Sequence, residues 1–293
     1  MQSVTSQRHL LLAMPPRFLG GFFHHGTDNH WLGLFAALSL LALAVGCASG
    51  PTPPSYPAFI NSDELPDIFM ASLPGIRAKQ FVGDFHTRST SNRVDLPADW
   101  QGTTGGSPGK ALEIFVLEGE LRLSDISLGS GGYAYIPPGS LGFNMQSDGG
   151  ARILYFLDDV VSSALIRTPL ILDSSLVDWQ ATDAIGVFTK DLRADPGSGG
   201  RTWLLRVEPQ AQIAWQSTSV LREGYLVSGQ YRDSECVNGE PYTDTYFPGG
   251  YFHRPANSVY GGSEAAALVE AIWFLRESTG STTVVTGCKI APQ

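Results

Sequence analysis

Short apolar runs alternate with polar turns along the body of the chain. Segments 113–118, 133–136, 202–207 and 268–274 are short and rich in β-branched and aromatic residues, which favour strands. The segments between them, such as 195–200 (DPGSGG), contain the glycine and proline that tight turns need. This pattern predicts an all-β body made of many short strands.

Two sequence blocks occur twice in the same order. Residues 131–140 (GGYAYIPPGS) match residues 249–258 (GGYFHRPANS). Upstream of them, residues 113–119 (EIFVLEG) match residues 223–229 (EGYLVSG). One structural unit has therefore been used twice along the chain.

Composition supports the same interpretation. The 293 residues include 33 Gly and 19 Pro, and 11% are aromatic, which favours strands and turns over long helices. A hydrophobic content of 43% is enough for two ordinary cores, so we expect two domains, over 59–165 and 166–293. A net charge of −9 without any Lys/Arg cluster argues against nucleic acid as a partner, because phosphates would be repelled.

The first 46 residues differ from the rest of the chain. Residues 31–45 (WLGLFAALSLLALAV) are almost all apolar, and Arg8 and Arg17 precede them. The run is shorter than the ~20 residues of a spanning helix and has the length of a signal-peptide core. We therefore predict a signal peptide over 1–46; a plain cleaved signal without lipidation and a hydrophobic anchor remain alternatives.

The end of this segment resembles a bacterial lipoprotein box. The box reads Ala44-Val45-Gly46-Cys47, with Ala44 where Leu is usual. The resemblance implies that Cys47 is acylated and that residues 47–58, which are rich in proline, tether the body to a membrane. Ala48 after the cysteine implies the outer membrane, so we expect a periplasmic lipoprotein of the cell envelope.

Two cysteines remain in the body, Cys236 and Cys288. In an oxidising compartment this pair favours a disulfide over a metal pair or a nucleophile, because neither cysteine has CxxC spacing or a neighbouring histidine. The bond would join the C-terminal tail to an insertion in the second repeat.

The repeated blocks resemble the two motifs of the cupin superfamily. Residues 113–120 and 131–140 carry this resemblance, and residues 190–196 (KDLRADP) followed by Trp203-Leu204-Leu205 resemble the ChrR-like bicupins of the DUF4437 type. The resemblance spans residues 65–276. It implies two tandem cupin barrels, which are double-stranded β-helices of the jelly-roll kind.

The metal ligands of that family are missing from the sequence. A metal-binding cupin presents His-x-His, then a Glu, then a third His. Glu113 and Glu223 lie at the Glu position, but residues 105–109 and 215–219 contain no histidine, and Gly142 and Tyr260 replace the third His. We therefore expect no metal and no other cofactor.

Without a metal, the two glutamates become candidate catalytic groups. If Glu113 and Glu223 point into apolar barrels, burial raises their pKa and suits them to general acid or base work. The alternative is that each one hydrogen-bonds a neighbour, such as Arg222 or Arg254. Other candidate ligand-binding residues lie at or near the former ligand positions and motifs of the second repeat: Gln216, His253, Tyr260, Trp215 and Tyr225. We predict that Glu223, Tyr260, His253 and Gln216 line one pocket in the second barrel.

Three functions fit these residues. The first is metal-free binding of a small molecule or a sugar, because aromatic residues gather near the motifs. The second is an enzyme, either a metal-dependent cupin with substituted ligands or a metal-free isomerase, lyase or hydrolase that uses Glu223 or Glu113. The third is a ChrR-like envelope stress sensor. The fold alone does not distinguish between these three functions.

Overall fold

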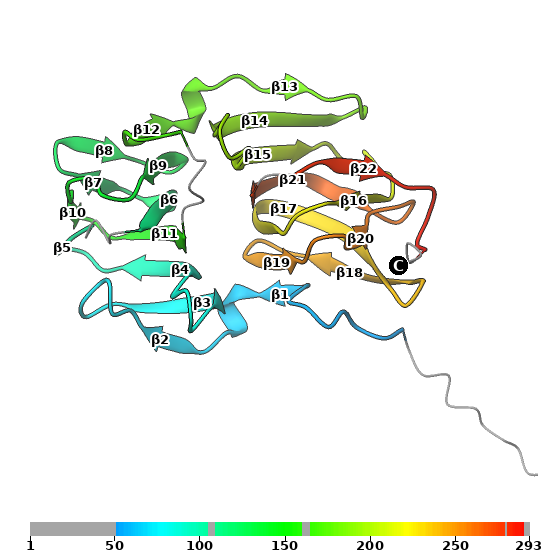
Figure 1. Cartoon of the computed structure of the whole chain (residues 1–293), viewed down its shortest axis with the longest axis horizontal. Coiled ribbons are helices and arrows are strands. Elements are labelled where there is room, and N and C mark those ends of the chain that lie inside the picture. Colours follow the sequence, from blue (N-terminus) through cyan, green and yellow to red (C-terminus); the bar gives the residue numbers. More distant parts are fainter. Residues whose placement is uncertain (1–50, 105–108, 160–164, 279, 290–293) are drawn as a thin grey trace, which may run out of the picture. The chain divides into compact units, whose positions relative to one another are not determined.

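Strands form nearly all of the regular structure (Figure 1). The computed structural model describes residues 51–104, 109–159, 165–278 and 280–289, so the predicted signal peptide and Cys47 lie outside the described residues. Among the described residues, no helix is long and apolar enough to span a membrane. The prediction of an all-β fold is confirmed.

The first barrel is built from two antiparallel sheets. One has the order β12-β9-β6-β11-β4-β3-β2 and the other the order β5-β10-β7-β8. Their apolar inner faces form one core, which includes Leu112, Leu123 and Ile136. The strands are β2 (Asp67–Phe69), β3 (Arg77–Gly83), β4 (Thr90–Leu96), β5 (Trp100–Thr103), β6 (Lys110–Gly119), β7 (Leu121–Leu123), β8 (Ile126–Leu128), β9 (Gly132–Ile136), β10 (Asn144–Ser147), β11 (Ala151–Asp159) and β12 (Leu170–Asp173).

The second barrel is one continuous 11-stranded sheet. Its longest strand, β17, pairs with β19 and β21 near its start and with β18 further along. Three register shifts between β17 and β21 bend the pair, as bulges do. The strands are β1 (Ile60–Asn61), β13 (Gln180–Ala181), β14 (Val187–Ala194), β15 (Arg201–Val207), β16 (Gln216–Thr218), β17 (Arg222–Val237), β18 (Glu240–Tyr246), β19 (Gly250–Arg254), β20 (Val259–Tyr260), β21 (Ala266–Glu277) and β22 (Thr282–Val284).

The last glycine of each repeated Glu block allows a close backbone approach. Gly119 and Gly229 have φ of 76° and 89°, values that L side chains rarely adopt. A Cβ at Gly119 would lie 2.2 Å from the Gly150 carbonyl oxygen, and one at Gly229 would lie 2.0 Å from that of Glu270. The two repeats therefore need glycine at the same place for the same reason.

The two repeats exchange their first strands. β1, at the start of the first repeat, pairs with β19 of the second barrel, and β12 pairs with β9 of the first barrel (Figure 1). A short 3-10 turn follows each of these strands, Ser62–Glu64 and Ser174–Leu176. Sheet membership thus crosses the predicted boundary at 165/166, and both barrels belong to one compact unit, Ser49–Gln293.

A third core lies between the barrels, and we call this region the junction. It contains aromatic residues of both repeats, such as Phe115, Phe156 and Phe274. The rings of Phe115 and Phe274 are 5.0 Å apart between centroids, and those of Phe156 and Phe274 are 5.7 Å apart. The junction therefore excludes water from the surfaces through which the barrels meet.

The two body cysteines form a disulfide. Cys236 of β17 is bonded to Cys288, and their Cα atoms lie 5.2 Å apart. The bond joins the β17–β18 hairpin to the segment after β22.

Candidate functional site between the two barrels

The repeated glutamates point out of their barrels. On β6, Leu112 and Ile114 belong to the core of the first barrel, whereas Glu113 alternates with them and shares its face with Phe115, in the junction. Glu113 therefore does not point into its barrel, which was the condition for a catalytic role in the sequence analysis. Strand β6 is buried on both faces, so its sequence shows no polar alternation that distinguishes one face from the other.

The second repeat behaves in the same way. On β17, Tyr225 lies in the junction core and Leu226 in the core of the second barrel. Glu223 shares the face of Tyr225, and the residue that points into the barrel is Arg222. Glu223 and His253 are paired in register, on the face opposite to the barrel interior. The predicted pocket of Glu223, Tyr260, His253 and Gln216 is therefore not formed.

Each glutamate is bound by hydroxyl groups from both repeats. Glu113 accepts hydrogen bonds from the hydroxyl groups of Tyr133 in its own repeat and Thr202 in the other. Glu223 accepts from Tyr251 in its own repeat and, at 2.6 Å, from Ser91 in the other. The arrangement is reciprocal, because β4 and β15 each contribute a hydroxyl group to the glutamate of the opposite repeat.

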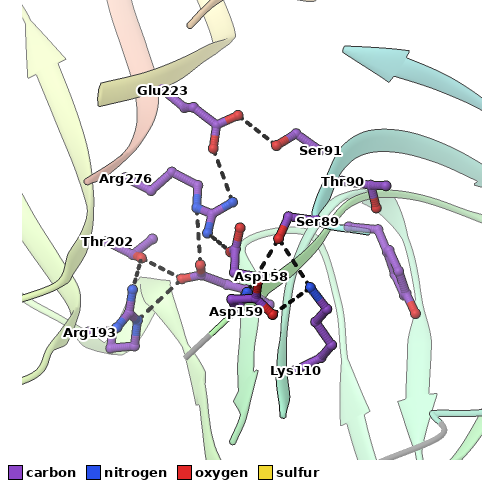
Figure 2. Close-up of polar contacts among 12 residues, drawn as sticks. Ser89, Thr90, Ser91, Lys110, Asp158, Asp159, Arg193, Thr202, Glu223 and Arg276 are labelled. Carbon is purple, nitrogen blue, oxygen red and sulfur yellow. Dashed lines mark hydrogen bonds and ion pairs between the residues drawn. The ribbon is translucent and has the colours of Figure 1, made fainter. Parts of the chain in front are cut away.

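Arg276 of β21 links the two glutamates, and Figure 2 shows it beside Glu223 and Asp158. Its Nε lies 3.2 Å from Glu113 and its Nη1 lies 3.1 Å from Glu223, while its Nη2 donates to Asp158. A second cation, Arg193, has its Nε 3.5 Å from Glu113. One buried guanidinium thus neutralises carboxylates from both repeats.

The junction cations change the titration of the acids. Burial alone would raise the pKa of Glu113, but Arg193, Arg276 and the hydroxyl donors together hold it below the usual value. The raised pKa that was expected for a glutamate inside an apolar barrel therefore does not apply to Glu113. Burial raises the pKa of Asp158, which Arg276 only partly offsets. Glu113 is held ionised, and Asp158 is the junction carboxyl that binds a proton more readily.

A cavity of about 200 Å³ opens beside this network. Arg193 and Asp195 reach it from the end of β14 and the turn that follows. Its lining comes from both repeats: Ala111, Glu113, Tyr135, Asp158, Asp159, Arg193, Asp195, Ser198, Gly200, Leu221, Glu223, Arg276, Glu277 and Ser278. Both repeated glutamates therefore contribute to one shared site and not to two separate barrels.

The interior of the second barrel holds a smaller cavity of about 40 Å³. Gln216, Arg222, Arg254 and Tyr260 line it, together with Asp233. Arg222 donates to the Tyr260 hydroxyl at 2.5 Å and to Glu277 at 2.7 Å. Arg254 donates to Asp233 at 2.5 Å and to Glu235 at 2.7 Å. This interior therefore holds an ion-pair network beside its apolar core, with room for little more than water.

The other predicted binding residues lie outside both cavities. Tyr225 is buried in the junction core beside Phe81. His253 is partly buried on β19. Trp215 packs on Gly262, where an added Cβ would come within 2.3 Å of the indole ring. Of the predicted set, Gln216 and Tyr260 therefore share one cavity and the two glutamates share the other.

The residues inside the barrels do not fit a transition metal. Arg222 points into the second barrel toward Tyr260, and a guanidinium repels a cation and offers it no lone pair. The equivalent residue in the first barrel is Leu112, within a hydrocarbon core. Among the described residues, no three His, Cys, Asp or Glu side chains are grouped so that they could hold a metal. Residues 105–108, which cover most of the first His-x-His position, lie outside the described residues.

Twelve of the fourteen residues that line the shared cavity were not predicted as site residues, among them Arg276, Arg193, Asp158 and Asp195. The register pairs Phe156 with Glu113 and Arg276 with Glu223, so Arg276 takes the place that Phe156 has in the first repeat. The repeated blocks therefore gave no signal for Arg276 or Asp158. Arg193 and Asp195 lie within the 190–196 segment that carries the finer family resemblance.

Comparison with solved structures identifies the fold. Similar structures include a candidate dioxygenase from Nostoc punctiforme, 20% identical with a TM-score of 0.62, covering 80% of this chain and 86% of that one. Protein YlbA from E. coli, of the DUF861 family, is 18% identical with a TM-score of 0.61, covering 74% and 89%. Oxalate decarboxylase from Bacillus subtilis is 13% identical with a TM-score of 0.58, covering 80% and 81%. No protein-family model matches the sequence, and no curated protein matches it. The chain has the cupin fold, in two tandem barrels.

Proposed function

We propose that this protein binds a small polar molecule or a sugar in the cavity at the junction, without a metal in either barrel. The observation that carries the proposal is the shared cavity of about 200 Å³. It lies below the range of roughly 300–1,000 Å³ that is typical of sites for drug-sized ligands, so the ligand is small. Polar groups from both repeats converge on the cavity, which is how ligand sites fix the orientation of what they bind.

The glutamates position the cations of this site. Glu113 and Glu223 have their oxygens engaged by hydroxyl groups and by Arg276. Buried charges that are paired and hydrogen-bonded hold a fixed geometry. We assign the two glutamates a positioning role, and we assign ligand contact to groups at the cavity surface such as Tyr135, Asp195 and Ser198.

We further propose that the binding module is carried on the cell envelope. The support is in the sequence: the apolar run before Cys47, the lipoprotein box and the Pro-rich residues 47–58. The finer relationship to ChrR-like bicupins of the DUF4437 type stays part of this proposal. It is supported by the 190–196 segment, which supplies two of the cavity residues, Arg193 and Asp195.

An enzymatic function is the second candidate. Two of the structural neighbours are a candidate dioxygenase and an oxalate decarboxylase. Within this chain the specific observation is Asp158, whose pKa burial raises and which lines the same cavity. A carboxyl group with a raised pKa is a candidate proton donor to a bound substrate.

The test is a ligand screen on full-length protein purified without chelator or His tag, after its metal content has been measured by mass spectrometry. A ligand present at 100 times its Kd stabilises the protein by about 2.7 kcal/mol. We expect this stabilisation without bound transition metal. About one equivalent of Fe, Mn, Zn, Ni or Cu would overturn the metal-free part of the proposal.

A pair of variants locates the ligand. Ser278 is exposed at the cavity, so Ser278→Trp should fill the cavity without disturbing a core. Ser127 of β8 is exposed in the first barrel and lies outside the cavity lining, and Ser127→Trp is the matched control. We expect ligand-induced stabilisation to be lost only in Ser278→Trp. Equal stabilisation of both variants would place the ligand elsewhere.

A further inference from the structure

The junction cavity carries more acids than bases. Its lining contains six carboxylates, from Glu113, Asp158, Asp159, Asp195, Glu223 and Glu277, but only two guanidinium groups, from Arg193 and Arg276. Directly behind the lining, Lys110 pairs with Asp159 at 2.7 Å and Arg222 pairs with Glu277 at 2.7 Å. Even with these two cations included, carboxylates outnumber cations at the site.

Asp195 adds an independent sign of a ligand. It is 2% exposed, and its Oδ1 accepts hydrogen bonds from the backbone N–H groups of Leu165, Gly197 and Ser198. Its Oδ2 has no hydrogen-bond partner among the described residues. A buried carboxylate oxygen without a donor is costly, and Asp195 belongs to the cavity lining. A donor on a bound ligand would satisfy it.

Asp158 is a second carboxylate of the cavity that a bound cation would stabilise. Burial raises its pKa, and the nearby charges of Glu223 and Glu113 raise it further despite Arg276. Its side chain is 37% exposed, which leaves it accessible from the cavity. A positive charge brought into the cavity would relieve this crowding, whereas an anion would add to it.

We infer that the junction cavity selects a small organic cation, whose ammonium group is bound by Asp195 and Asp158. The inference rests on the ligand-binding function proposed above and adds the chemical class of the ligand. An ammonium group has three donors and no acceptor, which complements the Asp195 oxygen that has no donor among the described residues. The arginines and serines of the lining leave hydrogen-bonding groups for a second, neutral or anionic end of the ligand.

Three probes of equal length and different charge test the class. These are 1,5-diaminopentane, 1,5-pentanediol and glutarate, each titrated into the full-length protein and followed by calorimetry and thermal shift. We expect the diamine to bind at least about tenfold more tightly than the diol, because a charged hydrogen bond contributes more than a neutral one. Glutarate should not bind. Diamine binding should also weaken as salt rises from 10 to 150 mM, since the screening length falls from about 30 to about 8 Å.

Asp195→Asn locates the selectivity. The amide oxygen can keep the three backbone hydrogen bonds of the turn, so we expect a folded variant that binds the diamine about tenfold more weakly. The control is Asp191→Asn. Asp191 lies on β14, the strand that leads into the turn of Asp195, and it is exposed and pairs with Arg201. Its loss should leave diamine binding unchanged. If Asp195→Asn fails to fold, the salt dependence of diamine binding to Asp159→Asn provides a second test. Diamine affinity should fall less steeply with salt in this variant, because the cavity has lost one negative charge.

The outcomes separate this inference from the proposed function. Binding of the diol or of glutarate at least as tightly as the diamine, abolished by Ser278→Trp, would overturn the ligand class and support the cavity. The absence of any diamine binding to the wild-type protein would also overturn the ligand class. Diamine binding that survives Ser278→Trp would overturn both.

Discussion

The two barrels share a backbone plan but differ at matching positions of their interiors. Three buried positions of the first barrel are Leu112, Leu123 and Ile136, which are 4%, 0% and 4% exposed. The matching positions of the second repeat are Arg222, Asp233 and Arg254, which are 8%, 4% and 2% exposed. The first interior is hydrocarbon, whereas the second combines an apolar cluster, which includes Leu226 and Trp273, with ion pairs between β17, β19 and β21.

What the repeats have in common therefore lies outside the barrels. Both keep a Glu and a Tyr that face the junction, Glu113 with Tyr133 and Glu223 with Tyr251. In each repeat a hydroxyl group from the other barrel completes the contact. The interiors can differ because each barrel needs only to pack its own core and pair its own buried polar groups. The faces at the junction must in addition fit each other.

The largest effect is expected when the residues at one matching interior position, Leu112 and Arg222, are exchanged between the barrels. Leu112→Arg gives the first barrel the residue of the second, but places a guanidinium in hydrocarbon with no carboxylate partner. We expect a loss of more than about 5 kcal/mol, which is enough to unfold a typical domain. Arg222→Leu should cost less, about 3–5 kcal/mol, because it leaves the nearly buried Glu277 without its partner. Urea denaturation followed by circular dichroism measures both, and a Leu112→Arg protein of wild-type stability would contradict the contrast.

The junction is tested by removing its central cation. Arg276→Met leaves Glu113, Glu223 and Asp158 without the guanidinium that they share, and breaking such a buried pair costs about 3–5 kcal/mol. Arg122→Met removes an exposed ion pair with Asp148 and should cost about 0–1 kcal/mol. Chemical denaturation of the two variants side by side gives the difference. Equal small losses would mean that the barrels do not depend on the junction network.

The disulfide is a further difference between the repeats, since only the second one contains it. Cys236 and Cys288 are 52 residues apart, and closing a loop of this length restricts the unfolded chain by about 4 kcal/mol. We expect the Cys236→Ser, Cys288→Ser double variant to lose up to this amount in thermal unfolding. Reducing agent should lower the Tm of the wild type to that of the variant and leave the variant unchanged.

The smallest expected effect is the pH dependence of stability that arises from Asp233 inside the second barrel. Burial and the neighbouring charge of Glu235 together raise the pKa of Asp233 to about 6, although Arg254 acts to lower it. An unfolded Asp titrates near 3.9, so the folded state binds this proton more tightly. The contribution of Asp233 to stability therefore rises as pH falls from above 6 to about 4.

Asp233→Asn should remove this dependence. We expect the free energy of unfolding of the wild type, relative to that of the variant, to increase by up to about 3 kcal/mol between pH 7 and pH 4. Because Asp233 and Glu235 share Arg254, the titration belongs to the pair. Asp125→Asn, on an exposed turn, is the control. If the difference in the free energy of unfolding between the wild type and Asp233→Asn stayed constant from pH 7 to pH 4, the raised pKa of Asp233 would be contradicted.

The sequence alone determined the fold class and the duplication. Glycine at matching places, such as Gly119 and Gly229, is required by local backbone geometry, so it is visible in the chain as a repeated letter. The strands were likewise predictable from the short apolar runs that turns separate. These features are local, and local features repeat whenever the structure repeats.

Only the tertiary structure decided which way the site residues point. Strands β6 and β17 are buried on both faces, one against a barrel interior and one against the junction. Polar alternation therefore disappears, and a shift of one residue moves Glu113 and Glu223 to the opposite face. The cavity joins Asp158, Asp195, Glu223 and Arg276 from both repeats. It depends on the packing of one barrel against the other, which neither repeat encodes by itself.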